Sequence, residues 1–345
     1  MSYNLIARKN HNFKKERISV FYMTNNNIKK EKKQDFLEFN NGKKKTSIKL
    51  AEIIKGKVGS TTLELIRNCS HFMRFNTDVT LEKRKLMQAN SCKNRFCPIC
   101  AYRKARKDGL KHMIMTKKLK KDNKYAFLFL TLTAPNVPGE RLEKEINEYA
   151  AAFKRLTKLK EFQAINKGYI RKLEVTYNAD RDDYHPHYHI LLCVDKNYFK
   201  DKKYIKQSKW LDMWQLAKRD NNISVVDVRR VKDSEEDNVY AEISKYTAKD
   251  SDYINNKKTF DVFYDALKHK QVITYNNIFK ELAKQYDNGE LDYLKDIDET
   301  KYVYRVIYKW YQNHYEELSI TELTEEEKNK LDHLIDEIEV ADLEE

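Results

Sequence analysis

The chain has 345 residues, and its 67 lysines and arginines against 53 acidic residues give a formal net charge of +14. Its longest apolar stretch, residues 126–134, is far shorter than the ~20 residues that a membrane-spanning helix needs. The start of the chain has no apolar core of a signal peptide. These features exclude membrane and secreted classes, so we expect a cytoplasmic protein whose reduced cysteines are free to bind metal.

The charge is unevenly distributed along the chain. Residues 1–120 hold 30 basic and 9 acidic residues, residues 121–315 hold 35 and 31, and residues 316–345 hold 2 and 13. A basic N-terminal third suits a polyanion such as DNA, because Lys and Arg displace counterions from phosphates. A lysine-rich solvated surface without such a partner is the alternative that charge alone leaves open.

The first two segments are basic. Residues 1–60 are polar and weakly periodic, which indicates a basic, partly mobile arm. Residues 61–120 combine a cysteine-bearing segment with a basic helix. The cationic side chains of this helix are candidates for phosphate contacts with DNA. They are Arg103, Lys104, Arg106, Lys107 and Lys111.

Four of the five cysteines lie in this second segment, at Cys69, Cys92, Cys97 and Cys100. Reduced thiolates at this spacing suit a tetrahedral structural zinc, with Cys69 in the fourth position. Unligated cysteines are the alternative. Cys193 lies inside an apolar strand, where a buried and inert thiol is expected.

Residues 121–255 alternate between strand and helix patterns. Strands are predicted near 125–133, 168–178, 186–194 and 223–231, and helices near 142–156, 210–217 and 235–250. This order predicts an α+β domain in which helices cover an antiparallel sheet. An aromatic-rich, largely helical region should follow over residues 256–315. The acidic tail, residues 316–345, should form a helix through Leu331, Leu334, Ile335 and Ile338.

Three histidines alternate in the predicted strand HPHYHILLCV. His185, His187 and His189 should share one face, with Tyr188 and the following apolar residues on the core face. Glu174 on the preceding strand is out of phase with its apolar neighbours, so it should also leave the core face. A carboxylate beside two or three histidines suits a divalent cation that also holds a phosphate. A histidine row exposed on an edge strand is the alternative.

A third group lies in the sequence AEISKYTAKD. On a helix, Glu242 and Tyr246 are neighbours, and Lys249 lies one turn further. Carboxylate, phenol and ammonium would then line one side. Such spacings also occur in ordinary solvated helix pairs, so this group alone is weak evidence of catalysis.

Together these motifs resemble the rolling-circle replication initiator (Rep) proteins of small plasmids of Gram-positive bacteria, members of the HUH endonuclease superfamily. The resemblance rests on the cysteine cluster, the strand FLFLTLT, the Glu-bearing strand, the histidine strand and the SKYTAK segment, and covers about residues 69–315. It implies a ferredoxin/RRM-like nicking domain over residues 121–255. Relaxases and single-strand transposases use the same chemistry and remain alternatives, as does a zinc-containing DNA-binding regulator without catalysis.

The resemblance also implies roles for individual residues. His187 and His189 would bind Mg²⁺ or Mn²⁺ with Glu174 as third ligand, while the status of His185 stays open. Tyr246 would form a 5′-phosphotyrosine link and free a 3′-OH that primes replication. Glu242 would activate water in the terminating step, with Lys249 near the phosphate. The implied partners are origin DNA, duplex and single-stranded, and a host helicase and polymerase, and a dimer is left open.

Overall fold

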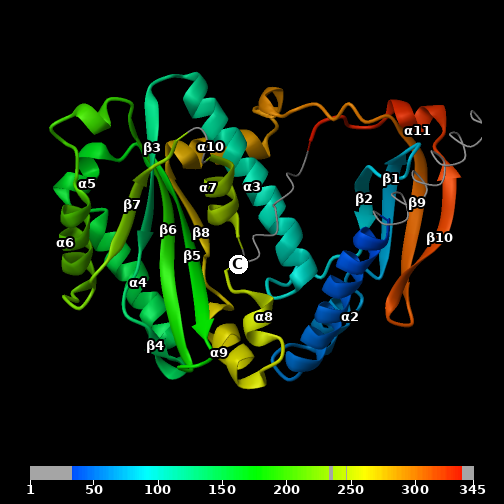
Figure 1. Cartoon of the computed structure of the whole chain (residues 1–345), viewed down its shortest axis with the longest axis horizontal. Helices are drawn as coiled ribbons and strands as arrows, with labels where there is room; N and C mark the ends of the chain where they lie inside the picture. The colour runs from blue at the N-terminus through cyan, green and yellow to red at the C-terminus, as the bar shows by residue number, and fades with distance from the viewer. Residues whose placement is uncertain (1–32, 233–235, 246, 336–345) are drawn as a thin grey trace, which may run out of the picture. The chain divides into compact units, whose positions relative to one another are not determined.

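The computed structural model describes residues 33–232, 236–245 and 247–335 (Figure 1). The chain divides into two units, one formed by the described residues up to Ile99 with Glu299–His333, the other by Cys100–Asp298 with the residues from Leu334. Both contain antiparallel strands flanked by helices, which confirms the predicted α+β class. Among the described helices, none combines the length and apolar character that crossing a bilayer requires.

The first unit contains a four-stranded antiparallel sheet in the order β10-β9-β1-β2. Its strands are β1 (Phe72–Asp78), β2 (Arg84–Ala89), β9 (Tyr302–Tyr311) and β10 (His314–Glu322), and its helices cover residues 33–53, α2 (Ser60–Arg67) and α11 (Glu325–Asn329). One sheet face packs its apolar residues against the helix over residues 33–53. Phe36 of that helix meets Phe75 of β1 edge-on, with ring centroids 5.3 Å apart.

Several predictions for this unit are wrong. Residues 33–53 are helical and not an arm, and residues 1–32 of the predicted arm lie outside the described residues. The predicted helical region ends in strand β9, whose aromatic residues alternate with a period of two and pair with β1. The predicted tail begins with β10, and residues 331–335 are not helical, while Ile338 lies outside the described residues. Strand β10 pairs with the adjacent strand β9, and β9 also pairs with the distant strand β1.

The second unit is built on a six-stranded sheet in the order β7-β3-β6-β5-β8, with β4 paired to β6. The strands are β3 (Tyr125–Leu132), β4 (Val137–Pro138), β5 (Gly168–Asn178), β6 (Asp183–Asp195), β7 (Val226–Arg230) and β8 (Ile273–Asn277). The α-helices are α3 (Pro98–Lys121), α4 (Leu142–Leu156), α5 (Lys160–Ile165), α6 (Gln207–Lys218), α7 (Glu236–Ser244), α8 (Asp250–Tyr253), α9 (Lys257–Leu267) and α10 (Ile278–Asp287). Short 3₁₀ turns occupy Gly139–Arg141, Tyr198–Lys200 and Asp292–Leu294.

Helices cover both faces of this sheet. Helices α4, α5 and α6 lie on one side, and α3, α7 and α10 lie on the other (Figure 1). On the first side, Tyr188 of β6 meets Tyr149 of α4 with ring centroids 5.5 Å apart. On the second, Leu191 and Cys193 of β6 belong to a buried cluster with α3, α7 and α10. The histidine face of β6 is therefore a second core face, and its histidines lie where that core ends.

Candidate metal centres

The predicted histidine and carboxylate ligands meet on strands β5 and β6. Glu174 lies directly opposite His187 in the strand pairing. Its Oε2 atom is 3.2 Å from His189 Nε2 and 3.7 Å from His187 Nε2, and the two Nε2 atoms are 3.1 Å apart. The three side chains are buried, and their donor atoms lie within 4.8 Å of one another. This donor set of two nitrogens and one oxygen can hold a divalent metal ion.

Burial and charge set the protonation of this centre. Burial alone would raise the pKa of Glu174, but the hydrogen bond with His189 and the electrostatic influence of the two histidines and Lys172 lower it overall. Burial lowers the pKa of His187 to about 4, against the opposing influence of Glu174. At neutral pH the carboxylate is therefore ionised and His187 is neutral, which are the states that metal binding requires.

A further layer of residues orients His189. Glu242 on α7 places Oε1 3.4 Å from His189 Nδ1, and Thr131 Oγ1 of β3 lies 3.3 Å from the same nitrogen. The other ring nitrogen, Nε2, therefore faces Glu174 and His187. Arg229 of β7 donates to Glu242 Oε2 over 2.9 Å. A carboxylate on the far nitrogen of a ligating histidine fixes its tautomer and ring orientation.

The third predicted group is only partly assembled. Helix α7 ends at Ser244, and Lys249 is the exposed N-cap residue of α8 instead of lying on the same helix. Tyr246 lies outside the described residues. The chain after it is tied to the sheet, because the carbonyl of Thr247 accepts a hydrogen bond of 2.8 Å from the backbone N–H of Val175. The helix is shorter than predicted. The backbone contact between Thr247 and strand β5 cannot be recognised from the local sequence pattern.

His185 does not join the three clustered ligands. Its ring stacks on that of His187, with centroids 5.2 Å apart, and its backbone carbonyl lies 3.2 Å from His187 Nδ1. Within the described residues, the group that can hold a metal comprises Glu174, His187 and His189. His185 thus supports the orientation of its neighbour through stacking.

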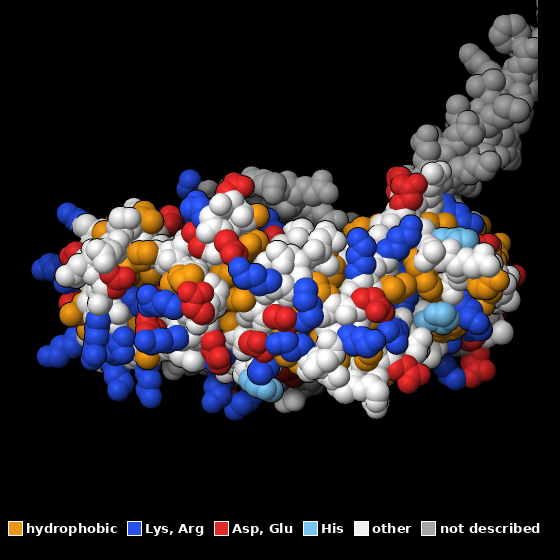
Figure 2. Space-filling view, turned by 90° about the horizontal axis from the view of Figure 1, so that it is seen from below, with side chains coloured by type: hydrophobic (Ala, Val, Ile, Leu, Met, Phe, Trp, Pro, Cys, Tyr) orange, Lys and Arg blue, Asp and Glu red, His pale blue; other side chains and the backbone are white. Residues whose placement is uncertain are grey.

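The basic side chains of α3 have mixed surroundings. Lys104 pairs with Asp108, and Lys111 is held by Asp287 at 2.7 Å, so neither charge is fully available to a phosphate. Arg106 stacks over Tyr102. Figure 2 shows Lys and Arg side chains gathered at the end of the second unit that carries α5 and α6, so basic surface extends well beyond α3.

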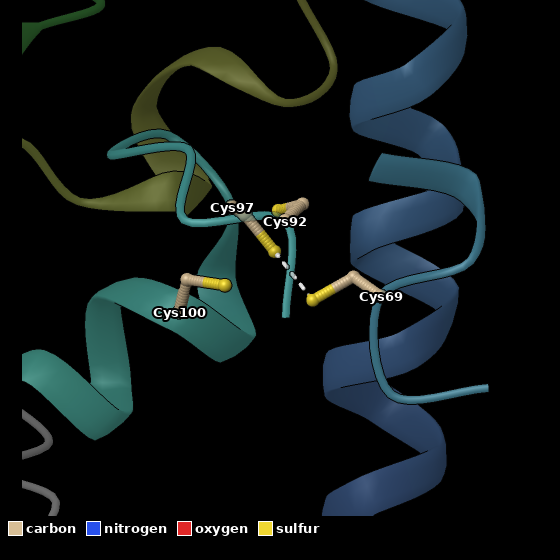
Figure 3. Close-up of side chains that lie close together, drawn as sticks. All are labelled: Cys69, Cys92, Cys97 and Cys100. Atoms are coloured by element: carbon tan, nitrogen blue, oxygen red, sulfur yellow. Dashed lines mark hydrogen bonds between the residues drawn. The ribbon is translucent and has the colours of Figure 1, made fainter. Parts of the chain in front are cut away.

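The four clustered cysteines form a second candidate metal centre. Their sulfur atoms lie within 4.8 Å of one another, and the side chains point toward a common centre (Figure 3). Cys69 and Cys97 are fully buried, with sulfurs 3.7 Å apart. The backbone N–H of Cys97 closes a tight turn onto the carbonyl of Asn94 at 3.1 Å. Four thiolates in this arrangement fit tetrahedral zinc.

Buried polar residues from the helix over residues 33–53 support this cluster. Lys44 is fully buried and donates to the carbonyls of Arg67 and Cys69, at 2.6 and 2.7 Å. Ser47 Oγ lies 3.4 Å from Cys97 Sγ. Burial lowers the pKa of Lys44, while the nearby cysteines oppose that shift. A buried cation beside four thiolates offsets the negative charge of a zinc site made of four cysteines.

Sequence reasoning missed several residues near these centres. Lys172 faces His189 across the strand pair and is 3% exposed, with a pKa that burial lowers to about 8. Its position two residues before Glu174 was a usable signal, because both must share a face. Arg229 and Lys44 gave no such signal, because their contacts depend on segments that are distant in sequence.

The chain is similar to known replication proteins. A family model described as "Replication protein" (Rep_1) matches residues 83–317. A "Protein rep" of Staphylococcus aureus is 47% identical over 216 residues, which cover 62% of this chain and 94% of the relative. A "Protein rep" of Bacillus sp is 36% identical over 268 residues, covering 70% and 87%, and one of Streptococcus pneumoniae is 33% identical over 269 residues, covering 74% and 83%. No solved structure matches.

Proposed function

The chain belongs to the Rep_1 replication protein family, and from this premise we propose that it initiates rolling-circle plasmid replication by nicking one strand of the origin through Tyr246. The observation that carries the proposal is the buried centre of Glu174, His187 and His189, with Glu242 beside it. A DNA-binding regulator without catalysis would not need this centre.

The first step is a transesterification. A tyrosine hydroxyl has an ordinary pKa of ~10 and is a poor nucleophile without help. Glu174, His187 and His189 would hold a divalent cation, Mg²⁺ or Mn²⁺, whose positive charge would polarise the scissile phosphate. The Tyr246 oxygen forms a bond to phosphorus while the bond between phosphorus and the 3′-oxygen breaks. The phenol loses its proton, and the 3′-oxygen gains a proton to become the new 3′-OH. The ester conserves the bond energy, so strands can later be rejoined.

Glu242 would act in the terminating step as a general base that takes a proton from water. Its two oxygens contact His189 and Arg229. Glu242 has about four lone-pair sites, so it can accept a hydrogen bond from a water molecule beside these two contacts. While both contacts hold, it orients His189 for metal binding, so the same carboxylate would serve the first step as a support and the last as a base. Lys249 would lie near the phosphate.

Helix α3 would hold origin DNA in this scheme. Four cysteines would bind structural zinc at the start of α3, whose cations would contact the duplex backbone. The scissile strand would enter the metal centre in single-stranded form. A host polymerase would then extend the freed 3′-OH while a host helicase separates the strands.

The proposal is tested with supercoiled plasmid that carries the origin, in the presence of Mg²⁺ or Mn²⁺. Wild-type protein should give nicked circles and a covalent protein–DNA adduct that survives denaturation, and Tyr246→Phe should give neither. Tyr204→Phe is the matched control, since this tyrosine is 48% exposed, and should behave as wild type. Nicking by Tyr246→Phe, or full activity in the presence of a chelator, would contradict the mechanism.

A further inference from the structure

A buried polar chain lies outside the metal centre and joins three elements of the second unit. His112 of α3 is fully buried, and its Nδ1 atom lies 2.9 Å from Oγ of Ser244, the last residue of α7. Its Nε2 atom lies 3.0 Å from the hydroxyl of Tyr275 on β8. The Tyr275 ring meets the imidazole edge-on, with centroids 5.8 Å apart. Both ring nitrogens are thus satisfied by hydroxyl groups.

The imidazole is neutral in this setting. Burial, reinforced by nearby lysines such as Lys172, lowers the pKa of His112 to about 3. A neutral imidazole donates through one nitrogen and accepts at the other, and each hydroxyl can take either role. The chain is therefore fully satisfied without a charge. Buried polar networks of this kind fix one arrangement of the elements that they join.

The position of Ser244 makes this hydrogen-bonded network relevant to the metal centre. Ser244 lies two residues after Glu242 and two residues before position 246. On the other side of position 246, the carbonyl of Thr247 accepts from the backbone of Val175, the neighbour of Glu174. Two anchors therefore bracket the proposed nucleophile in the sequence. One leads to α3 and β8, and the other leads to the strand that carries a metal ligand.

Helix α3 and strand β8, which carry His112 and Tyr275, are themselves well anchored. Helix α3 packs Leu110, Ile114 and Met115 into the buried cluster on the histidine side of the sheet, and strand β8 pairs with β5. Helix α7 has only 9 residues, of which Val239, Tyr240 and Ile243 enter the same cluster. Apolar contacts of a short helix tolerate small slides, whereas directed hydrogen bonds at its end do not.

We propose that Tyr275, His112 and Ser244 form a positioning relay that holds the end of α7 in register with the metal ligands, and thereby places Glu242 and Tyr246 for the reaction. In this proposal the three residues act through α7 and not on the phosphate, so they are positioning residues. The relay rests on the proposed nicking function, and it extends that function to residues on α3 and β8. A displacement of about 1 Å at a reacting group costs on the order of 100-fold in rate.

The test compares variants that remove only a hydroxyl group. Tyr275→Phe and Ser244→Ala each break one link, and Tyr198→Phe is the matched control because its buried hydroxyl accepts from the Ile205 N–H at 3.0 Å, away from α7. Formation of the covalent adduct with a single-stranded origin oligonucleotide is followed at saturating oligonucleotide and Mn²⁺. The two relay variants should react about 10- to 100-fold more slowly, with oligonucleotide affinity within about twofold of wild type. Tyr198→Phe should keep the wild-type rate.

Two further measurements separate positioning from general destabilisation. The double variant of Ser244 and Tyr275 should lose no more than the more affected single variant, because both links act through His112. Amide hydrogen exchange over residues 239–250 should increase in the relay variants, while exchange in β5 and β6 stays unchanged. Equal rate losses in Tyr198→Phe, or unchanged exchange over residues 239–250, would overturn the relay. If wild-type protein forms no adduct at all, the nicking proposal fails, and exchange alone still decides the relay.

Discussion

The two candidate metal centres differ in chemistry and in what surrounds them. The cysteine cluster offers four sulfur ligands, enough to fill a tetrahedral shell from the protein alone. The centre on β5 and β6 offers three ligands of mixed type, which leaves coordination positions for water or phosphate. The first is supported by the buried cation Lys44, and the second by the carboxylate of Glu242.

This difference is the one expected between a structural metal site and a reactive one. A closed thiolate shell carries excess negative charge and is balanced by a cation from a neighbouring helix. An open shell with one carboxylate and two imidazoles keeps net positive charge on the metal, and a carboxylate behind His189 strengthens that ligand. We therefore expect different results when the two centres are altered. Substitutions in the cysteine cluster should reduce stability, and substitutions in the centre on β5 and β6 should reduce activity.

The largest effect is expected at the open centre. Glu174→Ala removes the only carboxylate among the three clustered ligands, so nicking should fall by about 10³-fold or more, since charge stabilisation at the phosphate is lost. Thermal unfolding should change little. Nicking and melting curves measure the two effects.

Glu161→Ala is the matched control, because this carboxylate is exposed and pairs only loosely with Lys209 at 3.7 Å. It should keep full activity. A large loss of stability in Glu174→Ala, equal to its loss of activity, would remove the distinction between the two centres.

The next effect is expected at the closed centre. Cys97→Ser replaces a buried ligand, so bound zinc should be lost and the free energy of unfolding should fall by several kcal/mol, on the order of 2–5. Zinc content by atomic emission and urea unfolding measure this. Cys193→Ala, in the apolar core of the second unit, should keep its zinc. Zinc retained by Cys97→Ser would show that this cysteine is not a ligand.

A smaller effect is expected from the cation beneath the cysteines. Lys44→Met keeps the length of the side chain but removes its charge and its bonds to the carbonyls of Arg67 and Cys69. Zinc affinity should fall about 10- to 100-fold, the usual range for groups that support metal ligands. Competition with a coloured chelator measures it. Lys45→Met, on the same helix, is the control. Unchanged affinity in Lys44→Met would limit Lys44 to a packing role.

The parts of both centres that follow local patterns were predictable from sequence. The period of two in a strand placed His187, His189 and Glu174 on one face, and spacing grouped the cysteines. Contacts between distant segments were not predictable in this way. Lys44 reaches the carbonyl of Cys69 from 25 residues away, and Arg229 meets Glu242 only because β7 pairs with β3. The strand at residues 302–311 was mistaken for helix although its period of two and the adjacent strand at residues 314–322 are local signals, and only its other partner, β1, lies more than 200 positions earlier.

The smallest effect concerns acid tolerance, and it arises from two buried histidines of the second unit. Burial lowers the pKa of His187 to about 4 and that of His112 to about 3, from an ordinary value of 6.5. Between these values and pH 6.5 the unfolded chain binds protons that the folded chain does not, so stability falls as pH drops. Each histidine contributes about 1.4 kcal/mol per pH unit in that window.

Urea unfolding at pH 7, 6 and 5, without Mg²⁺ or Mn²⁺, should show this slope, and His112→Gln should make it shallower by that amount. An unchanged slope in His112→Gln would mean that His112 is not held neutral by its surroundings, and the satisfied, uncharged chain from Tyr275 to Ser244 would lose its physical basis.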